Sequence, residues 1–263
     1  MILDRIVEAK QKEVARLVRE LSEAQLINLI HKAGPRRSLS QALAQGIGPR
    51  IIAEVKRASP SEGPIDPDVK ADQVALSYQN GGAAAISVLT DTPFFQGCFA
   101  DLEQVKAAVK LPVLSKDFFI HEIQVWLAAA SGADAILLIA GLLDLARLKA
   151  MLSLAHELGM EALVEVRDRE ELEKAMALKP VIIGINNRNL KTMKVDIETT
   201  LKLLPEVSPE TILVSESGLA THEDLVYLSS AGVRAFLIGT SLMRSPDRTK
   251  ALKALIEGPD DTR

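Results

Sequence analysis

Three charged residues that end apolar segments of the chain have types and spacing suited to proton transfer. Glu54 and Lys56 close the apolar segment 51–57, and Lys116 closes the segment 112–118. Residues two apart on an extended chain point to the same side, so Glu54 and Lys56 share a face. A partly desolvated lysine can have a lowered pKa and act as a general acid. We interpret all three as acid–base candidates. The alternatives are a buried structural ion pair on the first segment and an ammonium group that reaches solvent on the second.

Three further apolar segments also end in polar side chains. Glu165 ends one of them, and Asn186 and Arg188 lie at the end of the next. Glu216 and Ser217 end a third. Any one of these residues could simply begin a solvated loop. All five segment ends together supply three carboxylates, two amines, a guanidinium and an amide, which indicates one polar pocket where the ends meet.

Two short glycine-containing motifs, SESG and IGTS, indicate an anion site. Gly218 and Gly239 would let the backbone approach a ligand closely. Backbone N–H groups near these glycines and Thr240 can hold a phosphate, helped by the positive end of a following helix. Lys56 could add a point charge to the same phosphate. The alternative is two tight turns that need glycine only for their geometry.

Other side chains carry weaker signals. Phe95 and Phe118 follow two apolar segments and could line the apolar part of a pocket, or equally cover the core. Cys98 has no basic neighbour in the sequence, which favours an inert thiol. Glu161 lies at the opposite end of its segment from Glu165 and is interpreted as structural. The four histidines lack metal-ligand spacing and are interpreted as surface residues.

These side chains need elements that bring segment ends together, and the sequence repeats such an element. Each apolar segment is five to eight residues long and rich in Ile, Val and Leu, which is typical of a strand buried on both faces. The segments are 51–57, 83–90, 112–118, 133–140, 161–166, 181–186, 211–216 and 235–239. Helical periodicity fills the stretches between them, and strand starts are about 26 residues apart.

This repeat predicts an α/β fold, a (βα)8 TIM barrel, whose functional residues lie at the carboxyl ends of the strands. A doubly wound open sheet is the alternative. It is disfavoured because the glycine fingerprint of dinucleotide-binding sheets is missing after the first strand.

The N-terminal region predicts a helical extension ahead of the barrel. Residues 2–31 alternate apolar and charged residues at helical spacing, and a shorter helical pattern follows Ser38. The apolar side of the first pattern is expected to hold Ile2, Ile6, Ala9, Val14, Leu17, Val18 and Leu21. Beyond the first strand, residues 57–66 are rich in Ser, Pro and Gly and are predicted to form a mobile loop; its closure over a substrate is a hypothesis.

Composition excludes several classes of protein. The 263 residues carry a net charge of −4 and 3 % aromatic residues, which argues against a nucleic-acid partner. A single cysteine allows no internal disulfide and no site built from several thiolates. The N-terminal residues are charged throughout, and no long uncharged apolar window occurs, so we expect neither a signal peptide nor a membrane span and assign the cytoplasm.

The motifs resemble those of the indole-3-glycerol phosphate synthase family. IIAEVKRASPSEG, PVLSKDFFI, EALVEV, IGINNRNL, VSESGL and AFLIGTSLM follow the family pattern in order and spacing, from about residue 2 to residue 256. The resemblance implies a lyase that converts 1-(2-carboxyphenylamino)-1-deoxyribulose 5-phosphate into indole-3-glycerol phosphate, carbon dioxide and water, with no metal or organic cofactor. It implies one domain over residues 1–263, with an extension at 1–46 and the barrel at 50–257. It also implies that the helices of the extension cover the barrel and contribute to the mouth of the substrate site. We further expect a monomer or weak homodimer whose partner is this phosphorylated small molecule.

The resemblance also implies a role for each matched residue. Lys116 would protonate the ribulose carbonyl oxygen as general acid, and Glu165, Glu54 and Lys56 would serve the later proton transfers and the dehydration. The catalytic residues that would position and polarise the substrate are Asn186, Arg188, Glu216 and Ser217. The phosphate would be held by Lys56, Ser59, Gly218, Gly239 and Thr240. The substrate ring would pack against Pro60, Phe95, Phe118, Leu137 and Leu190.

Two other functions stay open on the sequence. A phosphoribosylanthranilate isomerase would need a Cys and Asp pair at early strand ends, where this chain has Glu54 and Lys56. A natural or engineered barrel that binds a phosphorylated ligand without catalysis would be expected to have lost a catalytic lysine or glutamate, because an unused buried charge lowers stability.

Overall fold

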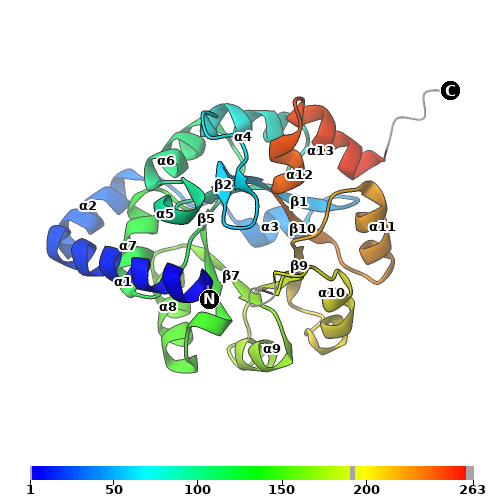
Figure 1. Cartoon of the computed structure of the whole chain (residues 1–263). Coiled ribbons are helices and arrows are strands. Elements are labelled where there is room, and N and C mark those ends of the chain that lie inside the picture. The colour runs from blue at the N-terminus through cyan, green and yellow to red at the C-terminus, as the bar shows by residue number, and fades with distance from the viewer. Residues whose placement is uncertain (1, 190–192, 259–263) are drawn as a thin grey trace.

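The computed structural model describes residues 2–189 and 193–258, and its centre is a closed barrel of eight parallel strands (Figure 1). In sequence order the strands are β1 (Arg50–Val55), β4 (Ala85–Leu89), β5 (Val113–Lys116), β6 (Ala135–Ile139), β7 (Glu161–Val166), β8 (Ile182–Asn186), β9 (Ile212–Glu216) and β10 (Ala235–Ile238). The barrel closes because β1 pairs with both β4 and β10. The predicted (βα)8 barrel is therefore confirmed, and the open-sheet alternative is wrong.

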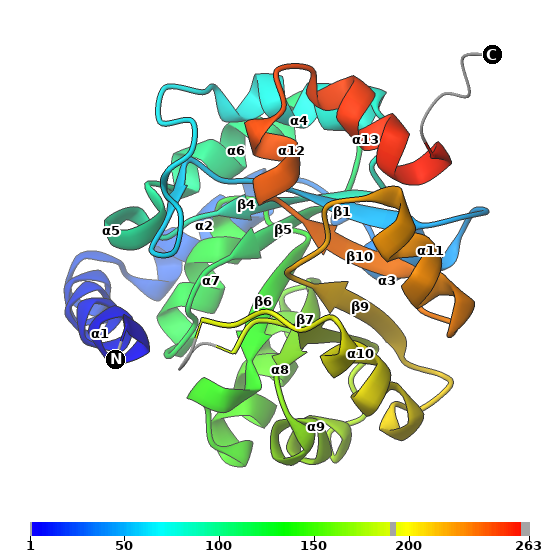
Figure 2. The same cartoon turned by 45° about the vertical axis from the view of Figure 1, so that its right-hand side comes forward.

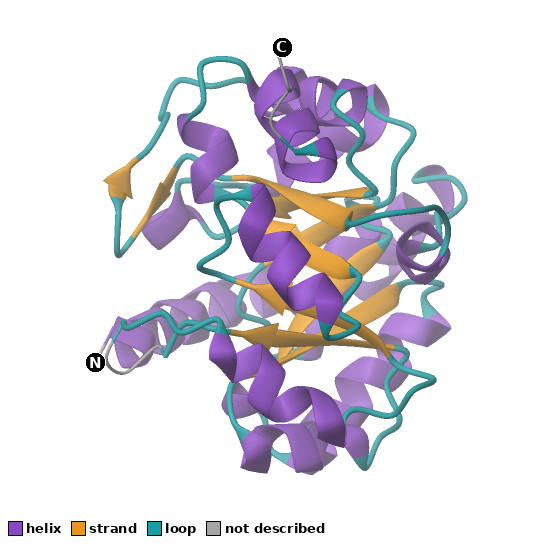
Figure 3. Cartoon of the chain, turned by 90° about the vertical axis from the view of Figure 1, so that its right-hand side faces the viewer, coloured by secondary structure: helices purple, strands orange, loops and turns teal. Residues whose placement is uncertain are grey.

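Helices surround the strands, as Figure 3 shows. The helices that follow the strands of the barrel, including two after the last strand, are α4 (Ala71–Asn80), α5 (Thr92–Phe95), α6 (Phe99–Ala108), α7 (Glu122–Ala130), α8 (Leu145–Glu157), α9 (Arg169–Met176), α10 (Glu198–Leu203), α11 (His222–Ser230), α12 (Thr240–Arg244) and α13 (Arg248–Glu257). Two short 3₁₀ turns lie at Ala140–Leu142 and Leu204–Glu206. Several helices begin with a side-chain cap, such as Asp168 before α9, which satisfies a free N–H of the first turn.

Alternation along the strands divides the barrel interior into an apolar layer and a charged layer. Ile52 and Leu163 lie in the interior apolar cluster. Because side chains alternate between faces, the residues two positions later, Glu54 and Glu165, point to the same interior nearer the carboxyl end. Leu114 precedes Lys116 in the same way, as Val214 precedes Glu216. The apolar layer thus lies beneath a ring of charged side chains at the carboxyl end of the barrel.

The N-terminal extension consists of α1 (Ile2–Glu20), α2 (Glu23–Lys32) and α3 (Leu39–Ala44). Figure 1 shows α1 and α2 outside the ring of barrel helices, beside α7. Helix α3 closes the amino end of the barrel, because its Leu39 and Leu43 join the interior cluster.

The predicted apolar side of the first helix is only partly correct. Ile6 and Leu17 are buried, but Val18 is 52 % exposed. A charged residue, Lys10, is fully buried on the same side. The helical pattern over 2–31 is also interrupted, because Ser22 caps a new helix with a reciprocal Ser–Gln capping box.

The segment after β1 contains a small antiparallel hairpin of β2 (Ala58–Ser59) and β3 (Gly63–Pro64). Figure 3 places this hairpin on the same side of the barrel as the N-terminus. Sequence reasoning predicted a loop here and missed the two strands, because they are only two residues long. None of the helices in the described part of the chain has the length and apolarity needed to cross a membrane.

Candidate active site

A cavity of about 390 Å³ lies at the carboxyl ends of the strands, a size typical of small-molecule sites. The predicted site residues that line it are Glu54, Lys56, Ser59, Pro60, Phe95, Lys116, Phe118, Leu137, Glu165, Asn186, Arg188, Ser217, Gly218, Gly239 and Thr240. Glu216 is 1 % exposed and lies beneath the lining, next to Lys116. Leu190 lies outside the described residues. The structure thus gathers side chains from nearly every strand end into one pocket.

Two lysines and three carboxylates form the charged centre of this cavity. Lys116 Nζ donates to Glu216 Oε2 at 2.8 Å. The same ammonium nitrogen lies 3.8 Å from Glu54 Oε2 and 4.0 Å from Glu165 Oε2. Lys56 Nζ lies 2.7 Å from Glu54 Oε1. The ion pair between Glu54 and Lys56 that the sequence left as an alternative is present, but it belongs to the cavity wall and is coupled to Lys116.

The surroundings of Lys116 raise its pKa. Burial alone would lower the pKa of this ammonium group, but the charges of Glu216, Glu54 and Glu165 more than offset burial. The lowered pKa considered from the sequence is therefore wrong in direction, because the sequence did not place three carboxylates around one amine. Lys116 is protonated at neutral pH, which is the state a general acid requires.

The carboxylates of Glu54 and Glu165 have pKa values shifted in opposite directions. Burial would raise the pKa of Glu54, but the adjacent Lys56 and Lys116 outweigh burial and lower it. Burial and the charge of Glu216 raise the pKa of Glu165 to about 7, while Lys116 opposes the shift. Two neighbouring carboxyl groups with separated pKa values can take different parts in acid–base chemistry.

One side of the cavity has the backbone geometry of an anion site. Ser217 and Gly218 both have positive φ angles, of 69° and 79°, which turn the chain sharply after β9. Gly239 precedes α12, and no side chain in the described residues caps the first turn of that helix. A Cβ atom on Gly239 would collide with Glu54, so a larger residue here would displace the carboxylate. Both glycine motifs line the cavity, and the phosphate site expected there stays a prediction.

The opposite side of the cavity is apolar. The rings of Phe95 and Phe118 lie 5.9 Å apart with an angle of 37° between their planes. Leu137 and Ile139, from β6, line the cavity with these rings. Both phenylalanines line the pocket, and Phe118 also packs against the interior apolar cluster.

Several lining residues were not found from the sequence. Ile2, Leu3 and Ile6 reach the cavity from α1. Figure 2 shows the segment that follows β8, drawn in yellow, crossing the strand ends, and its Met193 also lines the cavity. Arg244, at the end of α12, lines the cavity and donates to Glu62 Oε2 at 2.6 Å. The position of Arg244 just after the IGTS motif was a usable signal. The resemblance implied that the N-terminal helices contribute to the mouth of the site, but the sequence did not indicate which of their residues do so, because that depends on how α1 docks on the barrel.

Among the described residues no group of three or more His, Cys, Asp or Glu side chains is arranged to hold a metal ion. The single thiol, Cys98, donates to Asp101 Oδ2 at 3.3 Å, and burial raises its pKa. A raised pKa disfavours the reactive thiolate, in line with the predicted inert role.

The closed barrel and its charged cavity define the class of protein: a (βα)8 barrel with a pocket of lysine and carboxylate side chains at the carboxyl ends of its strands. Solved structures of low sequence identity share the fold. 3-Hexulose-6-phosphate synthase from Salmonella typhimurium has a TM-score of 0.62 at 11 % identity, covering 78 % of this chain and 96 % of its own. N-acetylmannosamine-6-phosphate 2-epimerase from Clostridium perfringens has a TM-score of 0.57 at 16 % identity, covering 79 % and 92 %.

Sequence comparison specifies the family. The family model described as indole-3-glycerol phosphate synthase matches residues 3–255. The indole-3-glycerol phosphate synthases of Chromobacterium violaceum and Magnetococcus marinus are 45 % and 46 % identical to this chain, each covering 97 % of both chains. That of Azoarcus sp. is 50 % identical over 79 % of both. The chain belongs to the indole-3-glycerol phosphate synthase family, which confirms the resemblance and excludes the isomerase.

Proposed function

We propose that this chain closes the indole ring of 1-(2-carboxyphenylamino)-1-deoxyribulose 5-phosphate, with Lys116 as the general acid. The products are indole-3-glycerol phosphate, carbon dioxide and water. The observation that carries the proposal is the position of the Lys116 ammonium group, which lines the cavity between an apolar wall and a glycine-rich cradle and is surrounded by three carboxylates.

The two ends of the cavity suit the two ends of this substrate. The aromatic ring packs against Phe95, Phe118 and Leu137, with Pro60 beside them. The phosphate binds backbone N–H groups at the two glycine motifs, with the ammonium group of Lys56 nearby. The ribulose carbonyl then lies between the two ends, next to Lys116.

In the first step the ring carbon that bears the carboxylate attacks the ribulose carbonyl carbon. Lys116 donates its proton to the carbonyl oxygen, so no alkoxide accumulates. The carboxylate leaves as carbon dioxide, and its bonding electrons restore the aromatic ring.

The second step removes the hydroxyl group formed in the first. Lys116 Nζ and Glu165 Oε2 are 4.0 Å apart, so one oxygen atom between them can reach both by hydrogen bonds. Glu165, with its pKa near 7, donates the proton that lets this oxygen leave as water. Glu54, whose pKa is lowered, stays ionised and stabilises the positive charge that develops on the substrate nitrogen. The methylene carbon beside this nitrogen then gives up a proton to the Glu165 carboxylate, which restores the acid and completes the indole ring.

Four residues position the substrate or the general acid. Asn186 Oδ1 accepts a hydrogen bond from Arg188 N at 2.9 Å, which fixes the start of the segment after β8. Arg188 and Ser217 line the cavity, where their donors can orient the substrate's oxygen atoms. Glu216 acts from below by holding Lys116 in place.

The fluorescence of the indole product tests the proposal. Purified protein is mixed with the substrate in the presence of a chelator, beside Lys116→Ala and the control Lys110→Ala, whose side chain is exposed after α6. We expect turnover by wild type and by the control, and a loss of about a hundredfold or more in Lys116→Ala, the scale of general acid catalysis. Inorganic phosphate should inhibit product formation by wild type and by Lys110→Ala with the same inhibition constant, and titration should give the same phosphate affinity for Lys116→Ala.

Two results would contradict the proposal. Wild-type protein that binds phosphate but forms no indole would be a non-catalytic barrel. Lys116→Ala that keeps turnover within about threefold of wild type would assign the acid to another residue.

A further inference from the structure

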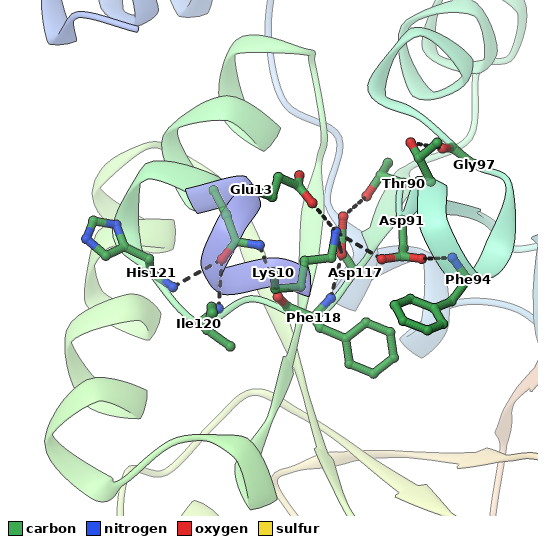
Figure 4. A network of polar contacts seen from close by, with 12 residues as sticks. Lys10, Glu13, Thr90, Asp91, Phe94, Gly97, Asp117, Phe118, Ile120 and His121 are labelled. Atoms are coloured by element: carbon green, nitrogen blue, oxygen red, sulfur yellow. Dashed lines mark hydrogen bonds and ion pairs between the residues drawn. The ribbon is translucent and has the colours of Figure 1, made fainter. Parts of the chain in front are cut away.

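The N-terminal helix contributes a buried charge that the chemistry above does not use. Lys10 lies on α1 and is fully buried, although helix surfaces that pack on a barrel are normally apolar at such positions. Its ammonium nitrogen lies 2.7 Å from Asp117 Oδ1, 3.1 Å from Asp91 Oδ2 and 2.8 Å from Glu13 Oε2. Figure 4 shows these side chains converging on the lysine.

The two aspartates come from the barrel, in the loops that follow two neighbouring strands. Asp91 follows β4 and Asp117 follows β5, directly after Lys116. Both are buried, and an uncompensated pair of carboxylates in this setting would repel each other. The carboxylates of Asp117 and Asp91 more than offset burial and raise the pKa of Lys10, which keeps the lysine charged.

Each aspartate also holds the backbone beside one of the cavity phenylalanines. Asp91 Oδ1 accepts from Phe94 N at 2.8 Å and thereby caps α5, the short helix that carries Phe95. Asp117 Oδ1 accepts from Phe118 N at 2.7 Å. Lys10 is therefore two contacts away from both rings of the apolar wall.

The partners of these aspartates leave Lys10 as the shared connection. Asp117 Oδ2 accepts from Thr90 Oγ1 at 2.9 Å. Asp91 Oδ2 is buried and has no hydrogen bond of good geometry within the described part of the chain, so the nearby ammonium group of Lys10 is what compensates its charge. One turn before Lys10 on the same helix face, Ile6 lines the cavity itself.

We propose that Lys10 is a positioning residue for the aromatic part of the substrate. By bridging Asp91 and Asp117 it fixes α5 against the loop after β5 and holds Phe95 and Phe118 in their relative orientation. It also fixes the first turn of α1 over the cavity. This assignment rests on the proposed function, since it presumes that the two rings bind the aromatic end of the substrate.

The proposal predicts that loss of Lys10 weakens binding of the aromatic ring and leaves phosphate binding and the chemical step unchanged. Lys116 is held by Glu216, Glu54 and Glu165, not by Lys10, and the glycine cradle lies on the opposite side of the cavity. Loss of Lys10 should therefore weaken substrate binding with little effect on the chemical step. A lysine that only stabilises the fold would change the amount of folded protein and hence apparent kcat, without changing KM in the folded fraction.

The test is the kinetics of Lys10→Met, which keeps the side-chain length and removes the charge. We expect KM to rise by about tenfold, the affinity equivalent of one well-formed aromatic contact, with kcat within about threefold. The inhibition constant of inorganic phosphate should stay unchanged. The matched control is Lys12→Met on the same helix, whose side chain is 75 % exposed and pairs with Glu8; its KM should equal that of wild type.

A second variant covers the case in which Lys10→Met does not fold. Asp91→Asn keeps an oxygen that can cap α5 but loses the ion pair, so it should raise KM in the same direction by a smaller factor. Unchanged KM in a folded Lys10→Met, or a phosphate inhibition constant that rises together with KM, would overturn the proposal. If wild-type protein shows no turnover, the proposed function fails, but the role of Lys10 can still be tested. Substrate affinity is then measured by titration of Lys116→Ala and of the double variant that also carries Lys10→Met. Equal affinities of the two proteins would overturn the role of Lys10.

Discussion

A single methyl group placed inside the barrel should disturb catalysis without touching the substrate. Gly184 lies in β8 between Glu165 of β7 and Val214 of β9, outside the residues that line the cavity. Its backbone has an ordinary φ, so alanine can adopt it. The Cβ atom of Gly184→Ala would fall inside the contact distance of Glu216 Oε1, the oxygen that faces away from Lys116.

The size of the effect follows from this clash. Carbon atoms in proteins essentially never come within 3.0 Å of such a neighbour, so the Glu216 carboxylate must withdraw by roughly 1 Å. Glu216 Oε2 holds Lys116 Nζ at 2.8 Å, and the lysine must follow or lose this hydrogen bond. Because a misplacement of about 1 Å can lower a rate by about a hundredfold, we expect kcat to fall by that factor. Overpacking should lower the free energy of unfolding by about 1–3 kcal/mol, which leaves the chain folded.

The assay is indole product fluorescence under saturating substrate, with thermal unfolding of the same samples. Gly81→Ala is the matched control, because its Cβ would meet Leu252 at 3.1 Å in the helical layer, away from the cavity. We expect the control to lose stability while keeping wild-type kcat. A folded Gly184→Ala with kcat within about threefold of wild type would refute the claim that Glu216 positions Lys116.

Two further predictions concern the two ends of β7. The pKa of Glu165 is about 7 in the folded chain and about 4.5 in the unfolded chain. Between these two pH values the folded state therefore binds more protons than the unfolded state, and the free energy of unfolding decreases as pH rises. Glu165→Gln should remove this decrease in thermal scans at pH 5 and pH 8, together with the inflection near pH 7 in kcat/KM; an unchanged pH profile would contradict the assignment. Glu161, at the amino end, accepts hydrogen bonds from Ser38 Oγ at 3.1 Å and Ser40 N at 2.8 Å. Glu161→Ala should therefore cost about 1–3 kcal/mol of stability in denaturant titrations with kcat unchanged, and a loss of kcat would show that this end of the strand matters to the reaction.

Much of the site could be predicted from the sequence because it depends on local periodicity. The two-residue alternation of a strand puts Glu54 above Ile52 and Glu165 above Leu163, whatever the rest of the chain does. The repeat of strand and helix then brings all carboxyl ends of the strands to one face. Residue type at a strand end was therefore enough to select most of the charged side chains that line the cavity.

Contacts between segments far apart in the chain are determined only by the tertiary structure. Lys116 and Glu216 are 100 residues apart, and their hydrogen bond depends on the register with which the barrel closes. That contact and the neighbouring carboxylates reversed the expected direction of the Lys116 pKa. In the same way Lys10 looks like an ordinary surface charge in its helix, and only docking against Asp91 and Asp117 buries it. Periodicity fixes which face a side chain takes within its own element, whereas its electrostatic surroundings are set by the other elements packed against that face.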